Sequence, residues 1–254
     1  MNFFNDISET INNNIAAVLC IIIGAEGSTP RKPGSKMLVF ADGSIKGTIG
    51  GGSIEKEAIE LARNMIGSDA PSVQSFNLAN DLEMHCGGRM TVYFEPLLQQ
   101  PELIIFGAGH VGKALAKLAS ISGFKITVAD NREGICATWP QGLATTYEMP
   151  FEEAAEKIKF HSNSYIVVTT YKHSFDSEVV AMLIDKPHKY IGMIGSVRKV
   201  DTARKRFSEE FNMPSNKINS IDMPIGIDIA CETPEEIAVS ILAKLIDVKN
   251  KNNR

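Results

Sequence analysis

The chain has 254 residues, of which 44% are hydrophobic and 22% charged, and this composition predicts one or two folded domains rather than a disordered chain. It carries 26 Lys and Arg against 30 Asp and Glu, so its net charge of −4 does not favour nucleic acid or an anionic membrane as the main partner. The longest apolar run, Ile15–Ala25, is shorter than the roughly 20 residues of a membrane-spanning helix. No Lys or Arg precedes Arg31 to form the basic head of a secretory signal, and we therefore expect a cytoplasmic protein.

The N-terminal part of the chain alternates short apolar runs with glycine-rich turns, which predicts a mixed α+β domain. The Asp42-Gly43 dipeptide is typical of a hairpin between two of its strands. Apolar residues at helical spacing follow a cluster of glycines and predict a helix over residues 54–66. The expected strands span residues 15–24, 36–40, 44–48, 73–77 and 90–95.

The pattern changes between Pro96 and Pro101, and we place a domain boundary there, with one domain over residues 1–98 and a second over residues 99–250. After the boundary, short apolar strands alternate with helical segments, which is typical of βαβ units and a parallel sheet. Thr233-Pro-Glu-Glu236 is typical of the start of a last helix, with a capping threonine and a capping box. The other expected elements are strands over 103–106, 126–129, 165–169 and 190–194 and a helix over 110–122.

The clearest motif is Gly107-Ala-Gly-His-Val-Gly112, which follows a predicted strand and opens a predicted helix. Its first glycine allows the tight turn, the second lets a phosphate approach the backbone, and the third lets the helix pack on the strand. Asp130 ends the next strand, where a carboxylate accepts hydrogen bonds from a ribose; it favours NAD, whereas Arg132 offers a partner for the 2′-phosphate of NADP. A nucleotide-type fold that has lost its nucleotide would show the same pattern. The residues of this candidate cofactor site are Gly107, Gly109, His110, Gly112 and Asp130.

Two glycine-rich segments of the N-terminal domain, residues 27–31 and 47–52, form a second candidate site. Exposed backbone N–H groups at the start of a helix bind anions, and an arginine holds a phosphate through two hydrogen bonds. A hairpin-to-helix corner that needs glycine for close packing would explain the same residues. Glu55 lies in the first turn of the helix, where the helix dipole alone favours a carboxylate. The candidate ligand-binding residues are Thr29, Arg31, Gly50, Gly51, Gly52 and Glu55.

The four cysteines form no CxxC pair, so they indicate neither a disulfide framework nor a zinc ribbon. Cys86 is the candidate reactive thiol, because Gly87 and Gly88 follow it on a predicted loop. The adjacent His85 would lower the pKa of this thiol if its ring turned towards the sulfur. A purely structural thiol is the alternative. His173 and Asp176 follow a strand of the second domain, and the sequence leaves the roles of these two residues and of His85 open.

Together these segments resemble the xanthine dehydrogenase accessory protein family, known as XdhC/CoxI. The likeness extends over nearly the whole chain, and it implies an N-terminal domain characteristic of that family followed by a Rossmann-like C-terminal domain. His85 and Cys231 depart from the residues that the family leads us to expect at their positions. The segments that carry the resemblance are Gly27–Arg31, Gly47–Glu55, Cys86–Gly88, Ile105–Gly112, Ile194–Ser196 and Pro224–Ile237.

Members of that family are chaperones that bind the molybdenum cofactor, molybdopterin, and help to load it in sulfurated form into molybdenum hydroxylases such as xanthine dehydrogenase. The resemblance therefore implies a non-catalytic or weakly catalytic accessory protein. In such a protein the pterin phosphate would bind at Gly50–Gly52 and Arg31, with Gly87 and Gly88 nearby. Cys86 would lie close to the metal as a soft ligand. The expected partners are a molybdenum hydroxylase client, a cysteine desulfurase and a second copy of this chain.

Two other functions stay open from the sequence. The first is an NAD(P)-dependent oxidoreductase with His110 or His173 as the proton donor, although the sequence contains no convincing acid–base pair. The second is a sulfur-transfer protein that carries a persulfide on Cys86.

Overall fold

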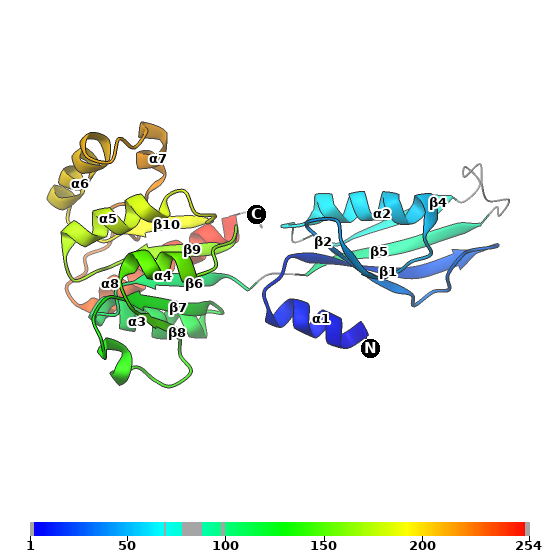
Figure 1. The fold of residues 1–254 in the computed structure, drawn as a ribbon, viewed down its shortest axis with the longest axis horizontal. Coiled ribbons are helices and arrows are strands. Elements are labelled where there is room, and N and C mark those ends of the chain that lie inside the picture. Colours follow the sequence, from blue (N-terminus) through cyan, green and yellow to red (C-terminus); the bar gives the residue numbers. More distant parts are fainter. Residues whose placement is uncertain (1–2, 69, 78–87, 98–99, 252–254) are drawn as a thin grey trace. The chain divides into compact units, whose positions relative to one another are not determined.

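The computed structural model describes residues 3–68, 70–77, 88–97 and 100–251. The chain folds into two compact units, residues 1–99 and 100–254 (Figure 1). The first unit is an antiparallel sheet with helices, and the second is a parallel sheet with helices. The predicted fold class, a mixed N-terminal domain followed by a Rossmann-like parallel-sheet domain, is thereby confirmed.

The first unit has five antiparallel strands in the order β3-β2-β1-β5-β4. An N-terminal helix, α1, precedes the strands, and the sequence analysis did not predict it. Helix α2 follows the glycine cluster, as the apolar spacing predicted. The elements are α1 (Phe3–Asn12), β1 (Ala17–Glu26), β2 (Lys36–Phe40), β3 (Ile45–Gly47), α2 (Gly52–Met65), β4 (Ser72–Asn77) and β5 (Arg89–Leu97).

The two helices cover opposite faces of this sheet (Figure 1). Alternate residues of β1 point to opposite faces, so Val18 and Cys20 belong to the core beneath α2, while Leu19 belongs to the core beneath α1. This explains why β1 is continuously apolar rather than alternating. Burial raises the pKa of the Cys20 thiol to about 12, so this cysteine behaves as a small buried hydrophobe.

The second unit has five parallel strands in the order β10-β9-β6-β7-β8. The order reverses at β6, and the crevice beside such a reversal is where α/β proteins bind their ligands. The elements are β6 (Glu102–Phe106), α3 (His110–Ile121), β7 (Lys125–Asp130), a 3-10 turn (Ile135–Thr138), β8 (Thr145–Glu148), α4 (Phe151–Lys157), β9 (Ser164–Val168), α5 (His173–Leu183), β10 (Tyr190–Met193), α6 (Val197–Glu209), α7 (Ser215–Ser220) and α8 (Pro234–Asn250).

Helices α3 and α8 pack on one face of the parallel sheet, and α4, α5 and α6 pack on the other. The start of α8 carries the predicted capping box: the N–H of Glu236 donates to the Thr233 hydroxyl, and the N–H of Thr233 donates to the Glu236 carboxylate. Among the described helices, none combines the length and the apolar character that crossing a membrane would take.

Candidate functional site

The register of the first sheet places the segments singled out from the sequence along its strands. β1 ends at Glu26, which is the register partner of Arg89 at the start of β5. β3 ends at Gly47, whose partner on β2 is Met37, and Met37 lies opposite Cys20 on β1. The end of β3 is therefore level with the middle of β1, and the register does not bring the start of β5 to the glycine loop.

The segments 27–31 and 47–52 are in contact at Gly50. A Cβ atom added to this glycine would lie 2.6 Å from Cγ of Pro30 and 3.6 Å from Cγ of Arg31. The φ angle of Gly50 is +137°, which side-chain-bearing residues rarely adopt. The position thus requires glycine for both its conformation and its packing. The structure brings Arg31 next to the glycine loop, as the sequence analysis expected of these two segments.

The glycine loop is held by the carboxylate of Glu55. Its Oε2 atom accepts hydrogen bonds from the Thr48 hydroxyl at 2.5 Å, from the N–H of Ile49 at 3.0 Å and from the N–H of Gly51 at 3.2 Å. The N–H of Gly50 donates to the Thr48 hydroxyl. Burial disfavours the charge on Glu55, but these hydrogen bonds outweigh it and hold the pKa of the carboxyl below its usual range. Glu55 therefore does more than complement the helix dipole.

This arrangement restricts which groups of the site are available to an external anion. The N–H groups of Gly50 and Gly51 already have acceptors within the chain. Among the described residues, none accepts a hydrogen bond from the N–H of Gly52 or pairs with the Arg31 guanidinium, and both residues are exposed. Thr29 is half-buried, and its hydroxyl donates to the carbonyl of Arg31.

Replacing Glu55 with Ala is expected to lower the free energy of unfolding of the first unit by about 1–3 kcal/mol, because the donors of Ile49, Gly51 and Thr48 lose a charged acceptor. Glu57 is an exposed carboxylate on the same helix, and Glu57→Ala serves as the control, with an expected change within about 0.5 kcal/mol. Urea unfolding followed by circular dichroism measures both. Equal stability of the two variants would contradict the role of Glu55.

Cys86 and Gly87 lie outside the described residues, as does His85. Gly88 is described and buried, and it immediately precedes β5. Arg31, which lies beside Gly50, and Lys32, which follows it, are both exposed. These two positive charges make the surroundings of the glycine loop suitable for an anionic ligand.

In the second unit, two glycines of the Gly107–Gly112 motif are required by the fold. A Cβ atom on Gly107 would collide with the carbonyl oxygen of Thr169, and one on Gly112 would collide with the carbonyl oxygen of Gly107. Gly109 is different, because a Cβ there would meet no atom within 4 Å and its φ of −68° suits any residue. The open space beside Gly109 is where a bound group would approach the N-terminus of α3.

Asp130, the expected ribose ligand, is fully engaged within the chain. Its two oxygens accept hydrogen bonds from the N–H of Ala108 at 2.7 Å and from Nε and Nη2 of Arg132, each at 2.8 Å. The Arg132 guanidinium also stacks on Tyr171, 4.5 Å from the ring centre. Burial disfavours the charge on Asp130, but its hydrogen bonds with Arg132 and Ala108 prevail and keep its pKa below the usual range. A ribose would have to displace Arg132 to reach this carboxylate.

The other candidates of the second unit lie at the starts of two helices: His110 begins α3, and His173 and Asp176 lie in the first turn of α5. His110 is exposed at the start of α3. Asp176 is buried, and it accepts hydrogen bonds from the N–H and the hydroxyl of Thr170, so it shapes the turn after β9. His173 begins α5, and its side chain lies outside the described residues. In the part of the chain that the structure describes, no group of His, Cys, Asp and Glu has the arrangement of a metal site.

The second unit is thus a Rossmann-type domain with an intact glycine turn. Asp130, at the position expected for a ribose ligand, already accepts hydrogen bonds from Ala108 and Arg132. The chain belongs to the XdhC family: residues 103–245 match the XdhC Rossmann domain, and residues 11–77 match the XdhC and CoxI family. The resemblance noted in the sequence is confirmed by these matches.

Three curated proteins are similar to this chain. The uncharacterised protein YqeB of Escherichia coli is 33% identical over 256 residues, which cover 98% of this chain and 47% of YqeB. A probable xanthine dehydrogenase subunit of Bacillus subtilis is 28% identical over 186 residues, covering 72% of this chain and 54% of that protein. The molybdenum cofactor insertion chaperone PaoD of Escherichia coli is 21% identical over 274 residues, covering 95% and 86%. The chain spans about half the length of the first two relatives.

The fold is also found in a crystal structure of a xanthine dehydrogenase from Bacillus halodurans. The two chains are 22% identical, with a TM-score of 0.51 over 99% of this chain and 96% of the other. At this level of sequence identity, the likeness shows that the two chains share a fold.

Proposed function

We propose that this chain is an accessory protein that binds the molybdenum cofactor and passes it to a molybdenum hydroxylase of the xanthine dehydrogenase type. Membership of the XdhC family supports this, as does similarity to relatives named as a molybdenum cofactor insertion chaperone and as a probable subunit of xanthine dehydrogenase. The observation that carries the proposal is the contact between the segments 27–31 and 47–52 at Gly50, which puts Arg31 beside the glycine loop.

The phosphate of molybdopterin binds beside this contact in the proposed complex. Arg31 supplies the charged donor, and the N–H of Gly52 at the start of α2 supplies a backbone donor. Gly50 and Gly51 shape the loop, because their N–H groups are held by Thr48 and Glu55. Lys32, next to Arg31 in the chain, adds to the positive potential around the site.

Cys86 supplies the thiolate that faces the molybdenum in this proposal. Its assignment is supported by the family motif Cys86-Gly-Gly88 and by the preference of molybdenum–sulfur centres for soft ligands. Gly88 immediately precedes β5, and Arg89 at the start of β5 pairs in register with Glu26 at the end of β1. The cofactor is carried in sulfurated form, with a cysteine desulfurase as the sulfur donor and a second copy of the chain as a further partner.

Replacing Cys86 with Ser is expected to abolish transfer of the cofactor to an apo-hydroxylase while the fold stays intact. Cys136→Ser is the matched control, because burial together with the neighbouring Glu148 raises the pKa of the Cys136 thiol to about 12 and makes it a poor nucleophile.

Arg31→Ala is expected to weaken cofactor binding about tenfold or more through the lost charged hydrogen bonds. Molybdenum content, pterin fluorescence after denaturation and recovered hydroxylase activity measure these effects. Unchanged loading by Cys86→Ser would contradict the proposal.

The proposal does not extend to an NAD(P)-dependent reaction. The carboxylate that would hold the ribose is bound by Arg132 and Ala108. Incubation with NADH or NADPH and candidate carbonyl compounds tests this alternative, because oxidation of the nucleotide is seen as a loss of absorbance.

A further inference from the structure

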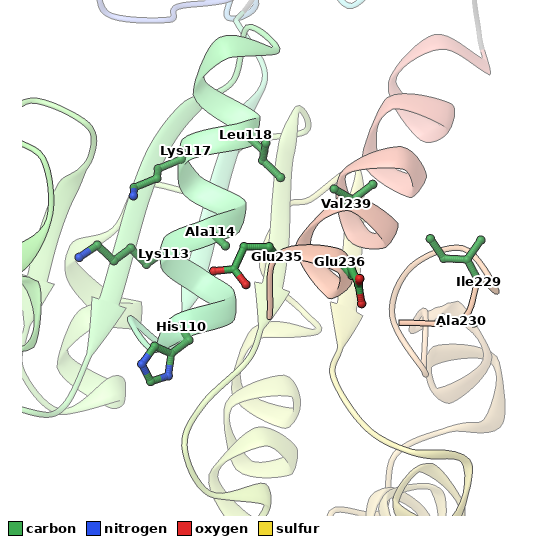
Figure 2. A pocket seen from close by; sticks show the side chains of 10 residues that line it. All are labelled: His110, Lys113, Ala114, Lys117, Leu118, Ile229, Ala230, Glu235, Glu236 and Val239. Carbon is green, nitrogen blue, oxygen red and sulfur yellow. The ribbon is translucent and has the colours of Figure 1, made fainter. Parts of the chain in front are cut away.

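Two pockets of the second unit differ in the groups that line them. One, of about 520 Å³, lies between α3 and α8, and Figure 2 shows apolar side chains such as Leu118 and Val239 along it together with charged ones. The other, of about 450 Å³, is lined by the 3-10 turn, the residues after it and β8. Both volumes are typical of ligand sites. Of the lining residues described, only those of the second pocket include a buried polar atom without a hydrogen-bond partner, Nε1 of Trp139.

This second pocket forms where the chain returns from the 3-10 turn to β8, the edge strand of the parallel sheet. Ala144, Thr146 and Glu148 alternate along the chain, so their side chains lie on one face of the sheet. Glu148 is the last residue of β8, at the carboxyl edge of the sheet, where α/β proteins bind their ligands. The pocket therefore places a carboxylate and an indole at the edge that suits a ligand site.

The carboxylate of Glu148 is fixed in this pocket as a charged acceptor. Its Oε1 accepts a hydrogen bond from the N–H of Cys136 at 2.8 Å, and its Oε2 accepts one from the N–H of Gly134 at 2.7 Å. These hydrogen bonds hold the pKa of the carboxyl below its usual range. The Cys136 thiol, whose pKa burial and Glu148 raise to about 12, stays protonated and is only a weak donor to the same group. An ionised carboxylate accepts about four hydrogen bonds, so an incoming pair of N–H groups completes the set once it displaces this weak donor.

Trp139 supplies a donor to complement this acceptor. Its side chain lines the pocket and is 9% exposed, and its indole N–H finds no acceptor within the part of the chain that the structure describes. Buried N–H groups are nearly always hydrogen-bonded, because an unpaired one carries the full cost of its lost hydration. An acceptor atom on a bound molecule would remove that cost. The pocket thus combines a charged acceptor with a donor that is free to bind.

We propose that this pocket binds the 2-amino-4-oxopyrimidine ring that guanine and the pterins share. On one edge of that ring two N–H donors stand side by side, and a carbonyl oxygen follows them directly. The donors pair with the two oxygens of Glu148, and the carbonyl oxygen accepts a hydrogen bond from Nε1 of Trp139. Adenine carries an acceptor nitrogen where guanine carries an N–H, so the charged carboxylate excludes it. This inference is independent of the proposed cofactor function, which concerns the first unit.

A series of ligands on the wild-type chain tests the donor pattern. Trp139 is the only tryptophan of the chain, so a change in tryptophan fluorescence reports occupancy of this pocket, and isothermal titration calorimetry measures the affinity. Guanosine is expected to bind, and inosine, which lacks the 2-amino group, is expected to bind about threefold to tenfold more weakly. Neopterin is the pterin probe, and the tighter of guanosine and neopterin identifies the source of the ring. Adenosine that binds as tightly as guanosine would overturn the proposal, as would failure of both guanosine and neopterin to bind at millimolar concentration.

Glu148→Gln is expected to weaken the binding of guanosine and neopterin at least about tenfold, because the glutamine amide presents a donor to one of the two ring donors. Glu156→Gln, the same change at an exposed position of α4, is the control and should leave binding unchanged. Trp139→Phe removes the N–H and is expected to weaken binding about threefold or more in calorimetry. Circular dichroism verifies the fold of each variant. Unchanged affinity of folded Glu148→Gln and Trp139→Phe would overturn the assignment of the ligand to this pocket.

Discussion

Gly107→Ala is expected to destabilise the second unit by about 3 kcal/mol or more. The new Cβ would collide with the backbone of Thr169, which cannot turn aside as a flexible side chain can. The φ angle of Gly107 is +122°, so an alanine would also be strained in that conformation. Because β6 and β9 are neighbouring central strands, relief of the collision would separate them at the edge where the sheet order reverses. Denaturant unfolding measures the loss.

Gly109→Ala is the matched control for this prediction. Its Cβ enters open space and its backbone angle is ordinary, so the expected cost is about 1 kcal/mol or less, mostly from a poorer residue at the helix N-cap. A ligand that approaches the start of α3 would be excluded by this methyl group, so loss of binding without loss of stability would mark a site there. Equal stability of the Gly107 and Gly109 variants would contradict the steric argument.

Asp130→Ala is expected to lower the free energy of unfolding by about 2–4 kcal/mol. The carboxylate is 0% exposed and accepts hydrogen bonds from Ala108 and Arg132, so its removal leaves a buried N–H and a guanidinium without their acceptor. The Arg132 side chain is 35% exposed and can turn to water, which keeps the cost below that of a fully buried ion pair. Thermal and urea unfolding measure the change.

The pH dependence of stability separates the charge of Asp130 from its packing. The pKa of Asp130 is lowered in the folded chain, so its contribution is fully present above the ordinary carboxyl range and is lost as the pH falls through the lowered value. Asp130→Asn is therefore expected to reduce the loss of stability on acidification. Asp228→Asn removes an exposed carboxylate from the same unit and should leave the acid profile unchanged. Identical acid profiles for the two variants would contradict this role of Asp130.

Much of the fold was predictable because the relevant information is local. The continuous apolar run of β1, the alternation of short strands and helices after Pro101 and the capping box at Thr233 each depend on neighbouring residues. The glycine motif before α3 was predictable for the same reason. Helix α1 was missed, although Phe3 and Ile7 are spaced to share one helical face and pack beneath the sheet.

The candidate site was only partly predictable, because hydrogen-bond partners are chosen by the folded structure. Asp130 has the sequence position of a ribose ligand, yet Arg132 and the N–H of Ala108, 22 residues away in the chain, occupy its oxygens. The glycine loop has the composition of an anion site, yet Glu55 holds two of its N–H groups. The same residue types are compatible both with these internal hydrogen bonds and with the binding of an external ligand.

The sequence by itself determined the central strands of both sheets, the helices that follow Gly51 and Gly109 and the glycine turns, since their formation depends on the conformational preferences of adjacent residues. Only the tertiary structure decided which donors are left for a ligand, because a carboxylate that is buried beside a donor binds it in preference to solvent or an external anion. The pocket lined by residues of α3 and α8 likewise exists only because two helices distant in the chain lie side by side.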